Sequence, residues 1–136
     1  KKFFNKNKFD KRYNIIGDFD LFVRMSIKNK IGVIQEPLAY YRLHKNNLSL
    51  KKVDLNVNEL KNWLLEKSKK KVFKSFDLSK VREKTQLLEI KHLLIENKKT
   101  LAFNQIFTKP VFISKYKFLL LILLPNKLIK NLFGLT

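Results

Sequence analysis

The sequence predicts an α/β chain, with one helix and two short strands before residue 50 and mostly helices after it. Three observations predict this. Residues 18–29 carry apolar side chains at helical spacing, residues 31–35 and 38–43 read as extended runs around Glu36-Pro37, and helical spacing returns from about residue 53. We therefore expect two units, residues 1–50 and residues 51–136.

The composition fits a folded chain with a strong positive charge. Of 136 residues, 45% are hydrophobic, which is enough for a buried core. Thirty Lys and Arg against eleven Asp and Glu give a net charge of +19. This excess favours a polyanionic partner, such as an anionic membrane surface or a phosphate-bearing ligand. Nucleic acid is disfavoured, because there are four Arg and no basic recognition helix.

Other features narrow the chemistry. The chain has no Cys, which excludes disulfides, thiolate metal sites and a Cys nucleophile, and it has two His. Residues 1–14 read as an irregular basic and aromatic lead-in without the apolar core of a signal peptide. The first residue is Lys rather than Met, so we expect a fragment of a longer protein.

The expected helix at residues 18–29 begins with two carboxylates. Asp18 stands where an acid can cap free backbone N–H groups and meets the positive end of the helix dipole. Asp20 is either a second capping acid or the partner of Arg24, one helical turn later. The helix is apolar over most of its girth, which predicts that it is buried.

The second expected strand ends in a polar cluster. In an extended chain Tyr40, Arg42 and His44 point to the same side, so Arg42 and His44 would face one space. Two readings remain open. A His near a strand end is often a hydrogen-bonded surface residue, whereas Arg beside His suits phosphate neutralisation or a divalent-metal contact.

The region after residue 50 reads as helical support. A helix is expected from about Val53 to Lys71 and a longer one from about Ser79 to Lys99. The apolar run Phe118–Leu124, followed by Pro125, is far shorter than the roughly 20 residues that span a bilayer. It predicts either a helix lying in the plane of an anionic membrane surface or a helix packed on a missing upstream domain. Two apolar faces are expected on the helices: Leu60, Trp63, Leu64 and Lys67 on the first, and Val81, Thr85, Leu88, His92 and Ile95 on the second.

Two stretches support a family resemblance. Gly-Asp-Phe-Asp-Leu-Phe-Val-Arg (17–24) and the run ending in Tyr-Arg-Leu-His-Lys-Asn-Asn-Leu-Ser (41–49) resemble the C-terminal part of the catalytic domain of family 2 glycosyltransferases. The resemblance covers about residues 9–49 and implies the Rossmann-like GT-A fold, followed by a helical extension. Gly17 departs from the family pattern, which often has Glu there.

The resemblance implies roles for four residues. Asp18 matches the base that deprotonates the acceptor hydroxyl, and His44 matches the His near the donor diphosphate and its Mg²⁺ or Mn²⁺. Arg42 lies beside His44, and Asp20 and Arg42 are expected to contact substrate. The partners implied are a nucleotide-sugar donor and a glycan or lipid-linked acceptor.

The resulting expectation is part of an inverting glycosyltransferase of polysaccharide biosynthesis. We expect it in the cytoplasm, peripheral at the inner face of the plasma membrane. The Asp-x-Asp metal motif of the donor-binding half is not in the chain, so we expect no activity from the chain alone. The alternative is a non-catalytic basic module that binds an anionic membrane or nucleic acid.

Overall fold

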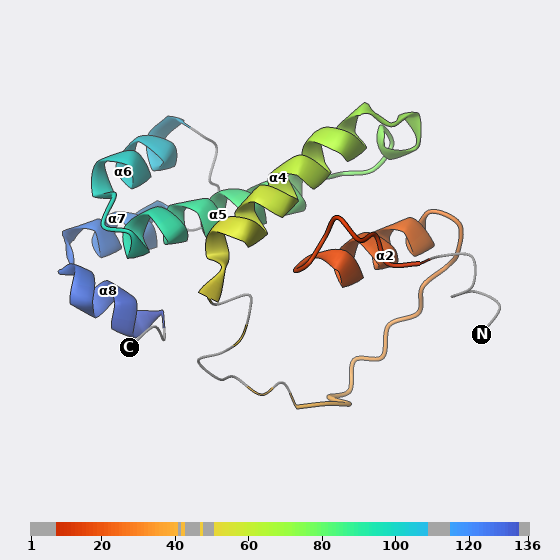
Figure 1. Cartoon of the computed structure of the whole chain (residues 1–136), viewed down its shortest axis with the longest axis horizontal. Helices are drawn as coiled ribbons and strands as arrows, with labels where there is room; N and C mark the ends of the chain where they lie inside the picture. Colours follow the sequence, from red (N-terminus) through yellow and green to blue (C-terminus); the bar gives the residue numbers. More distant parts are fainter. Residues whose placement is uncertain (1–7, 41, 43–46, 48–50, 109–114, 134–136) are drawn as a thin grey trace.

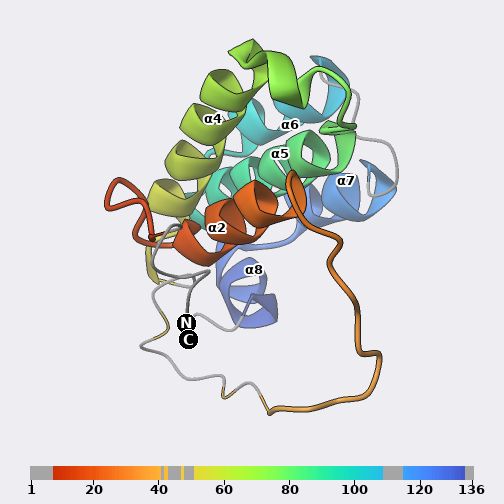
Figure 2. The same ribbon diagram turned by 90° about the vertical axis from the view of Figure 1, so that its right-hand side faces the viewer.

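The structure is a computed structural model that describes residues 8–40, 42, 47, 51–108 and 115–133, and all of its regular structure is helical. The expected α/β fold is therefore wrong for the described part of the chain. The helices pack around a long central helix, α5 (Figures 1 and 2). In order they are α2 (Gly17–Ser26), α4 (Val53–Lys69), the short 3₁₀ helix η1 (Lys71–Phe73), α5 (Ser79–Ile95), α6 (Lys99–Thr108), α7 (Lys115–Leu123) and α8 (Asn126–Leu132).

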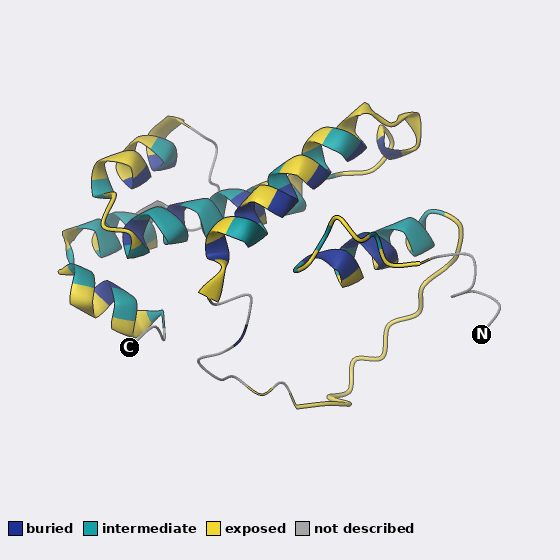
Figure 3. Ribbon diagram, in the orientation of Figure 1, coloured by how far each residue is buried: buried dark blue, intermediate teal, exposed yellow. Residues whose placement is uncertain are grey.

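The expected strands are replaced by an exposed connection between α2 and α4. Residues 28–40 are all exposed, and the connection runs away from the helices (Figures 1 and 3). Within the described residues, 31–40 form no backbone–backbone hydrogen bonds. A strand needs a second strand to pair its N–H and C=O groups, so an alternating pattern without such a partner gives only an extended loop.

The expected helices are present with small shifts at their ends. Helix α2 ends at Ser26, three residues before the expected end, and its Phe22 is 58% exposed rather than buried. On α4, Leu60, Trp63 and Lys67 are buried together, as the helical spacing predicts. The long helix expected to Lys99 ends at Ile95, and α6 begins at Lys99.

The break between α5 and α6 is made by Asn97. This residue has φ 57, the left-handed conformation that Asn tolerates better than most side chains. The N–H of Lys98 donates to the carbonyl of Leu93 at 2.8 Å, and the N–H of Asn97 donates to Leu94 at 3.1 Å. This pair of bonds is a Schellman cap, which satisfies the last carbonyls of α5 and turns the chain into α6.

Two hydrophobic clusters share α5. The first joins α2, α4 and η1 to α5 around Ile16, Leu60, Trp63 and Phe73, with Val81 and Leu88 of α5 packed against it. It therefore combines residues from before and after residue 50, and the division into units at that point stays a prediction. The second cluster joins α5 to the C-terminal helices and consists of Ile90, Leu94, Ala102, Ile106 and Ile129.

The apolar run near the C-terminus forms α7, and it packs on this chain's own helices. Leu119, Leu121 and Ile122 lie against the second cluster. Pro125 breaks the helix, and α8 returns to place Ile129 in the same cluster. Among the described helices, none combines the length and the apolarity needed to cross a bilayer.

Packing of α8 is tested by a pair of neighbouring substitutions. Ile129 is fully buried, so Ile129→Ala should lower the free energy of unfolding by about 2–5 kcal/mol through lost burial and a residual cavity. Leu128 is 47% exposed, and Leu128→Ala should cost less than about 1 kcal/mol. Urea denaturation followed by circular dichroism measures both, and equal costs would contradict this placement of α8.

Candidate functional site

The two carboxylates of the Asp-Phe-Asp sequence lie in opposite environments. Asp18 is exposed in the first turn of α2, whereas Asp20 is fully buried between α2 and α4. Residues two apart on a helix point about 200° from one another, so one acid can face the protein while the other faces solvent. The two acids therefore have different surroundings in spite of their closeness in the sequence.

Asp20 is held by three donors. The indole N–H of Trp63 donates to Oδ1 at 2.9 Å, and Nζ of Lys67 lies 2.9 Å from the same oxygen. Nε of Arg24 donates to Oδ2 at 2.7 Å, which is the pair expected from the spacing. Burial by itself raises the pKa of Asp20, but the hydrogen bonds from Lys67, Arg24 and Trp63 prevail and hold its pKa below the ordinary value of 3.8.

Glu59 of α4 fixes the residues just before α2. Its carboxylate accepts hydrogen bonds from the backbone N–H groups of Asn14 at 2.8 Å, Ile15 at 3.0 Å and Ile16 at 3.1 Å. Glu59 is 6% exposed, so these charge-assisted bonds compensate for its burial. Together Glu59 and Asp20 attach the start and the body of α2 to α4.

Asp18 is left on the open side of this arrangement. Its Oδ1 accepts a hydrogen bond from the N–H of Phe19 at 2.7 Å, so Asp18 contributes to the first turn without occupying the N-cap position, which is Ile16. The carboxylate borders a hollow of about 380 Å³ between α2, α4 and α5. Such an acid can both orient a ligand and exchange a proton with it.

Both polar and apolar side chains line the hollow at Asp18. Asn56 contributes from α4, and Lys80 and Lys84 contribute from α5. The amide Oδ1 of Asn56 is buried and has no hydrogen-bond partner among the described residues. An acid, a free amide oxygen and two ammonium groups suit a ligand with several hydroxyls and a negative charge. The apolar residues that line the hollow are Ile15, Ile16, Phe19, Leu60 and Val81.

The remaining expected site residues lie on the connection after α2. Arg42 is exposed, and its carbonyl accepts a hydrogen bond at 3.3 Å from the side chain of Asn47, which is 8% exposed. His44 lies outside the described residues, so its distance from Asp18 is not defined and its metal role stays a prediction. Substrate contact by Asp20 and by Arg42 also stays a prediction, with Asp20 fully buried in this structure.

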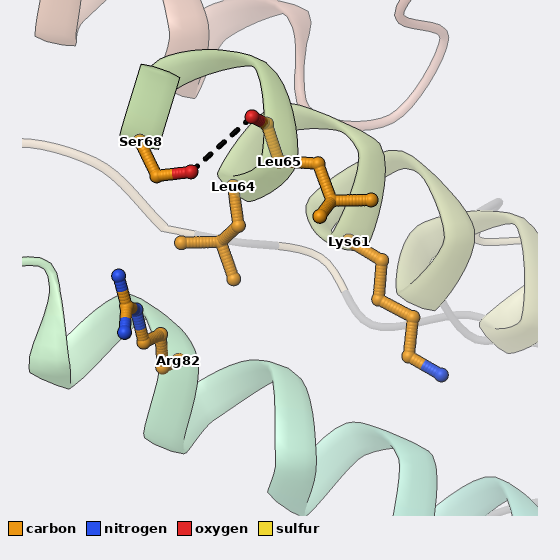
Figure 4. A pocket seen from close by; sticks show the side chains of 5 residues that line it. All are labelled: Lys61, Leu64, Leu65, Ser68 and Arg82. Carbon is orange, nitrogen blue, oxygen red and sulfur yellow. Dashed lines mark hydrogen bonds between the residues drawn. The ribbon is translucent and has the colours of Figure 1, made fainter. Parts of the chain in front are cut away.

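A second hollow, of about 520 Å³, lies between α4 and α5 (Figure 4). Its polar side chains are Lys61, Ser68 and Arg82. Lys61 is paired with Glu89 at 2.6 Å, and the Ser68 hydroxyl donates to the carbonyl of Leu65 at 3.2 Å. None of its lining residues is an acid, so this hollow lacks the proton acceptor that the hollow at Asp18 has.

The sequence did not reveal that Glu59 positions the residues before α2, or that Lys67 pairs with Asp20. Lys67 did carry a signal, because it falls on the apolar face with Leu60 and Trp63, and a buried Lys requires an acidic partner. Glu59 carried no comparable signal, since its partners are backbone N–H groups of residues 43 to 45 positions earlier. Gly17 is buried, and a Cβ there would lie 3.6 Å from Phe9, an ordinary contact.

Asp20→Asn should lower the free energy of unfolding by about 3–5 kcal/mol, because it removes the carboxylate that lies 2.9 Å from Lys67, which is 3% exposed, and leaves only the longer contact of 3.6 Å with Glu66. Asp18→Asn changes an exposed acid and should cost less than about 1 kcal/mol. Urea denaturation of the two variants provides the comparison. An Asp20→Asn variant as stable as Asp18→Asn would show that the buried network does not hold α2.

Acid should destabilise the fold. Hydrogen bonds from Lys70 are the largest cause that lowers the pKa of Glu66 to about 2, from an ordinary 4.5, and the pKa of Asp20 is also lowered. The unfolded chain therefore takes up these protons first, so the free energy of unfolding should fall as the pH drops from about 4.5 to about 2.

Urea denaturation across this pH range measures the effect. Glu66→Gln should flatten the dependence, whereas Glu36→Gln, which removes the same charge from the exposed connection, should not. If the free energy of unfolding depends on pH equally steeply in the two variants, Glu66 is not the source of the pH dependence.

Comparison of the chain with protein-family models, with curated proteins and with solved structures finds no match. Across residues 8–40, 51–108 and 115–133 there is also no group of three or more His, Asp or Glu placed to hold a metal ion.

Proposed function

We propose that this chain supplies the general base of an inverting glycosyltransferase, which moves a sugar from a nucleotide-diphosphate donor to a hydroxyl of a glycan or lipid-linked acceptor. The observation that carries the proposal is the contrast between the surroundings of Asp18 and those of Asp20. One acid is buried and bonded to α4, and the other is exposed and lines a hollow. The resemblance of residues 17–24 and 41–49 to family 2 glycosyltransferases supports the same assignment.

The proposed step is a direct displacement. The Asp18 carboxylate takes the proton of the acceptor hydroxyl, and the acceptor oxygen attacks the anomeric carbon of the donor sugar. The bond from that carbon to the diphosphate oxygen breaks on the opposite face, so the configuration inverts and the nucleoside diphosphate leaves. The proton on Asp18 passes to water when the product departs. A base within hydrogen-bond reach typically contributes on the order of 10²–10⁴ to the rate.

The walls of the hollow would orient the acceptor. The unpaired Oδ1 of Asn56 can accept a hydrogen bond from a second acceptor hydroxyl. The Ile and Phe side chains that line the hollow offer an apolar surface for the face of a sugar ring. The buried bonds of Glu59 and Asp20 hold Asp18 in place relative to these walls, because a base acts only at a defined distance.

Among the described residues, no group of acids and His is placed to hold the divalent cation expected for the donor diphosphate, and the metal role of His44 stays a prediction. Both oxygens of Asp20 are bonded to Arg24, Trp63 and Lys67, so this acid is not available as a ligand. The donor-binding residues are proposed to belong to other parts of the enzyme, together with Arg42 and His44.

Asp18→Asn, made in the complete polypeptide encoded by the gene that contains this chain, should reduce sugar transfer by about 10²–10⁴. Donor binding should be nearly unchanged, because the lost group acts on the acceptor. The measurements are release of nucleoside diphosphate from a panel of nucleotide sugars and titration calorimetry with the donor.

Asp54→Asn is the matched control, since Asp54 is an exposed acid in the first turn of α4 that does not line the hollow. It should keep full activity. Near-normal turnover by Asp18→Asn, or an equal loss in both variants, would refute the assignment of Asp18 as the base.

A further inference from the structure

The C-terminal helices expose Leu side chains beside residues that are well packed. On α7, Leu119, Leu121 and Ile122 pack against the second cluster, whereas Leu120 is 65% and Leu123 is 80% exposed. At 100° per residue, Lys117, Leu120 and Leu123 follow one another along a single exposed arc of this helix. One face of α7 therefore packs on the protein, and another apolar face is exposed.

Helix α8 repeats this arrangement. Ile129 is fully buried, whereas Leu128 is 47% and Leu132 is 65% exposed. Leu128 and Leu132 are four residues apart and so lie on the same face, next to the exposed Lys127. Two exposed Leu on each of two consecutive short helices are more than the single scattered apolar side chains of an ordinary surface.

The C-terminal segment that carries this surface has charges of one sign. No Asp or Glu follows Glu96 in the sequence, and the residues after it include seven Lys. Two of them, Lys117 and Lys127, are exposed beside the Leu of α7 and α8. Exposed apolar side chains beside Lys, in a segment that itself carries no acid, match the boundary between anionic lipid headgroups and acyl chains. The seven Lys are Lys98, Lys99, Lys109, Lys115, Lys117, Lys127 and Lys130.

We propose that the exposed faces of α7 and α8 dock on the surface of an anionic lipid bilayer. The four Leu enter the headgroup–acyl boundary, and the Lys side chains extend toward lipid phosphates. The core-facing residues of both helices stay packed on α5 and α6, so docking requires no unfolding. This binding is independent of the proposed transferase chemistry, because Asp18 lines a hollow formed with α4 and α5, to which no residue of α7 or α8 contributes.

Vesicle flotation with the full chain tests this proposal. The chain should float with vesicles of phosphatidylglycerol and phosphatidylcholine, bind vesicles of phosphatidylcholine alone at least tenfold more weakly, and lose binding as salt screens the lysines. Leu120→Ser with Leu123→Ser, and separately Leu128→Ser with Leu132→Ser, should each lower the partition constant on the order of tenfold. Lys117→Gln with Lys127→Gln should lower it for the anionic vesicles.

Matched controls distinguish binding through this face from a general effect of net charge or of exposed apolar side chains. Leu65→Ser removes a Leu that is 62% exposed on α4, and Lys28→Gln with Lys30→Gln removes two exposed charges from the connection after α2. Both control variants, and Asp18→Asn, should float like the unsubstituted chain. Fluorescence of the buried Trp63, the one Trp of the sequence, reports whether each variant is folded.

Several outcomes would overturn the proposal. These are no flotation, equal losses in the control variants, or a dimer detected by sedimentation that the Leu substitutions break, which would assign the face to a second copy. Leu120→Trp gives a direct readout, because its emission should shift to the blue with anionic vesicles, and an unchanged spectrum contradicts insertion.

Discussion

The buried carboxylate of Asp20 is the contact on which the N-terminal half of the structure depends. It joins α2 to α4 through Trp63 and Lys67, with Arg24 on its other oxygen. A buried acid is costly unless its oxygens are hydrogen-bonded, and here both are. Trp63 also packs on Phe19, with ring centroids 5.0 Å apart, so the polar contact and the apolar packing position the same helix.

This contact determines where the neighbouring acid can act. With Asp20 fixed against α4 and Glu59 holding the residues before the helix, Asp18 has little freedom to leave the rim of its hollow. Preorganised groups act without a reorganisation cost at the moment of reaction. The stability of α2 and the chemistry proposed for Asp18 are therefore separate properties of two residues that are two positions apart, and the two aspartate variants address them individually.

Local patterns in the sequence predicted the helices well, and the long-range contacts poorly. The spacing of Leu60, Trp63 and Lys67 predicted a shared face of α4, which is buried. The spacing of Asp20 and Arg24 left their ion pair as one of two possibilities, and the structure shows the pair. The bonds from Trp63 and Lys67 to Asp20 connect residues more than 40 positions apart, and periodicity carries no information about them. The strands were predicted from the strand-like runs at residues 31–35 and 38–43, and such a run cannot distinguish a paired strand from an extended loop. Asp18 lies in the first turn of α2, as the sequence predicted. His44 lies outside the described residues, so its position relative to Asp18 is not defined.

The exposed connection between α2 and α4 has a consequence for handling the protein. Ile31, Val33, Ile34 and Leu38 are 48%, 81%, 68% and 72% exposed, and the described backbone there has no hydrogen-bonded partner strand. An extended apolar stretch with free N–H and C=O groups is a template for pairing with the same stretch of another molecule. Concentrated preparations are therefore prone to aggregate through this loop, and Glu36-Pro37 is the gatekeeper that interrupts it.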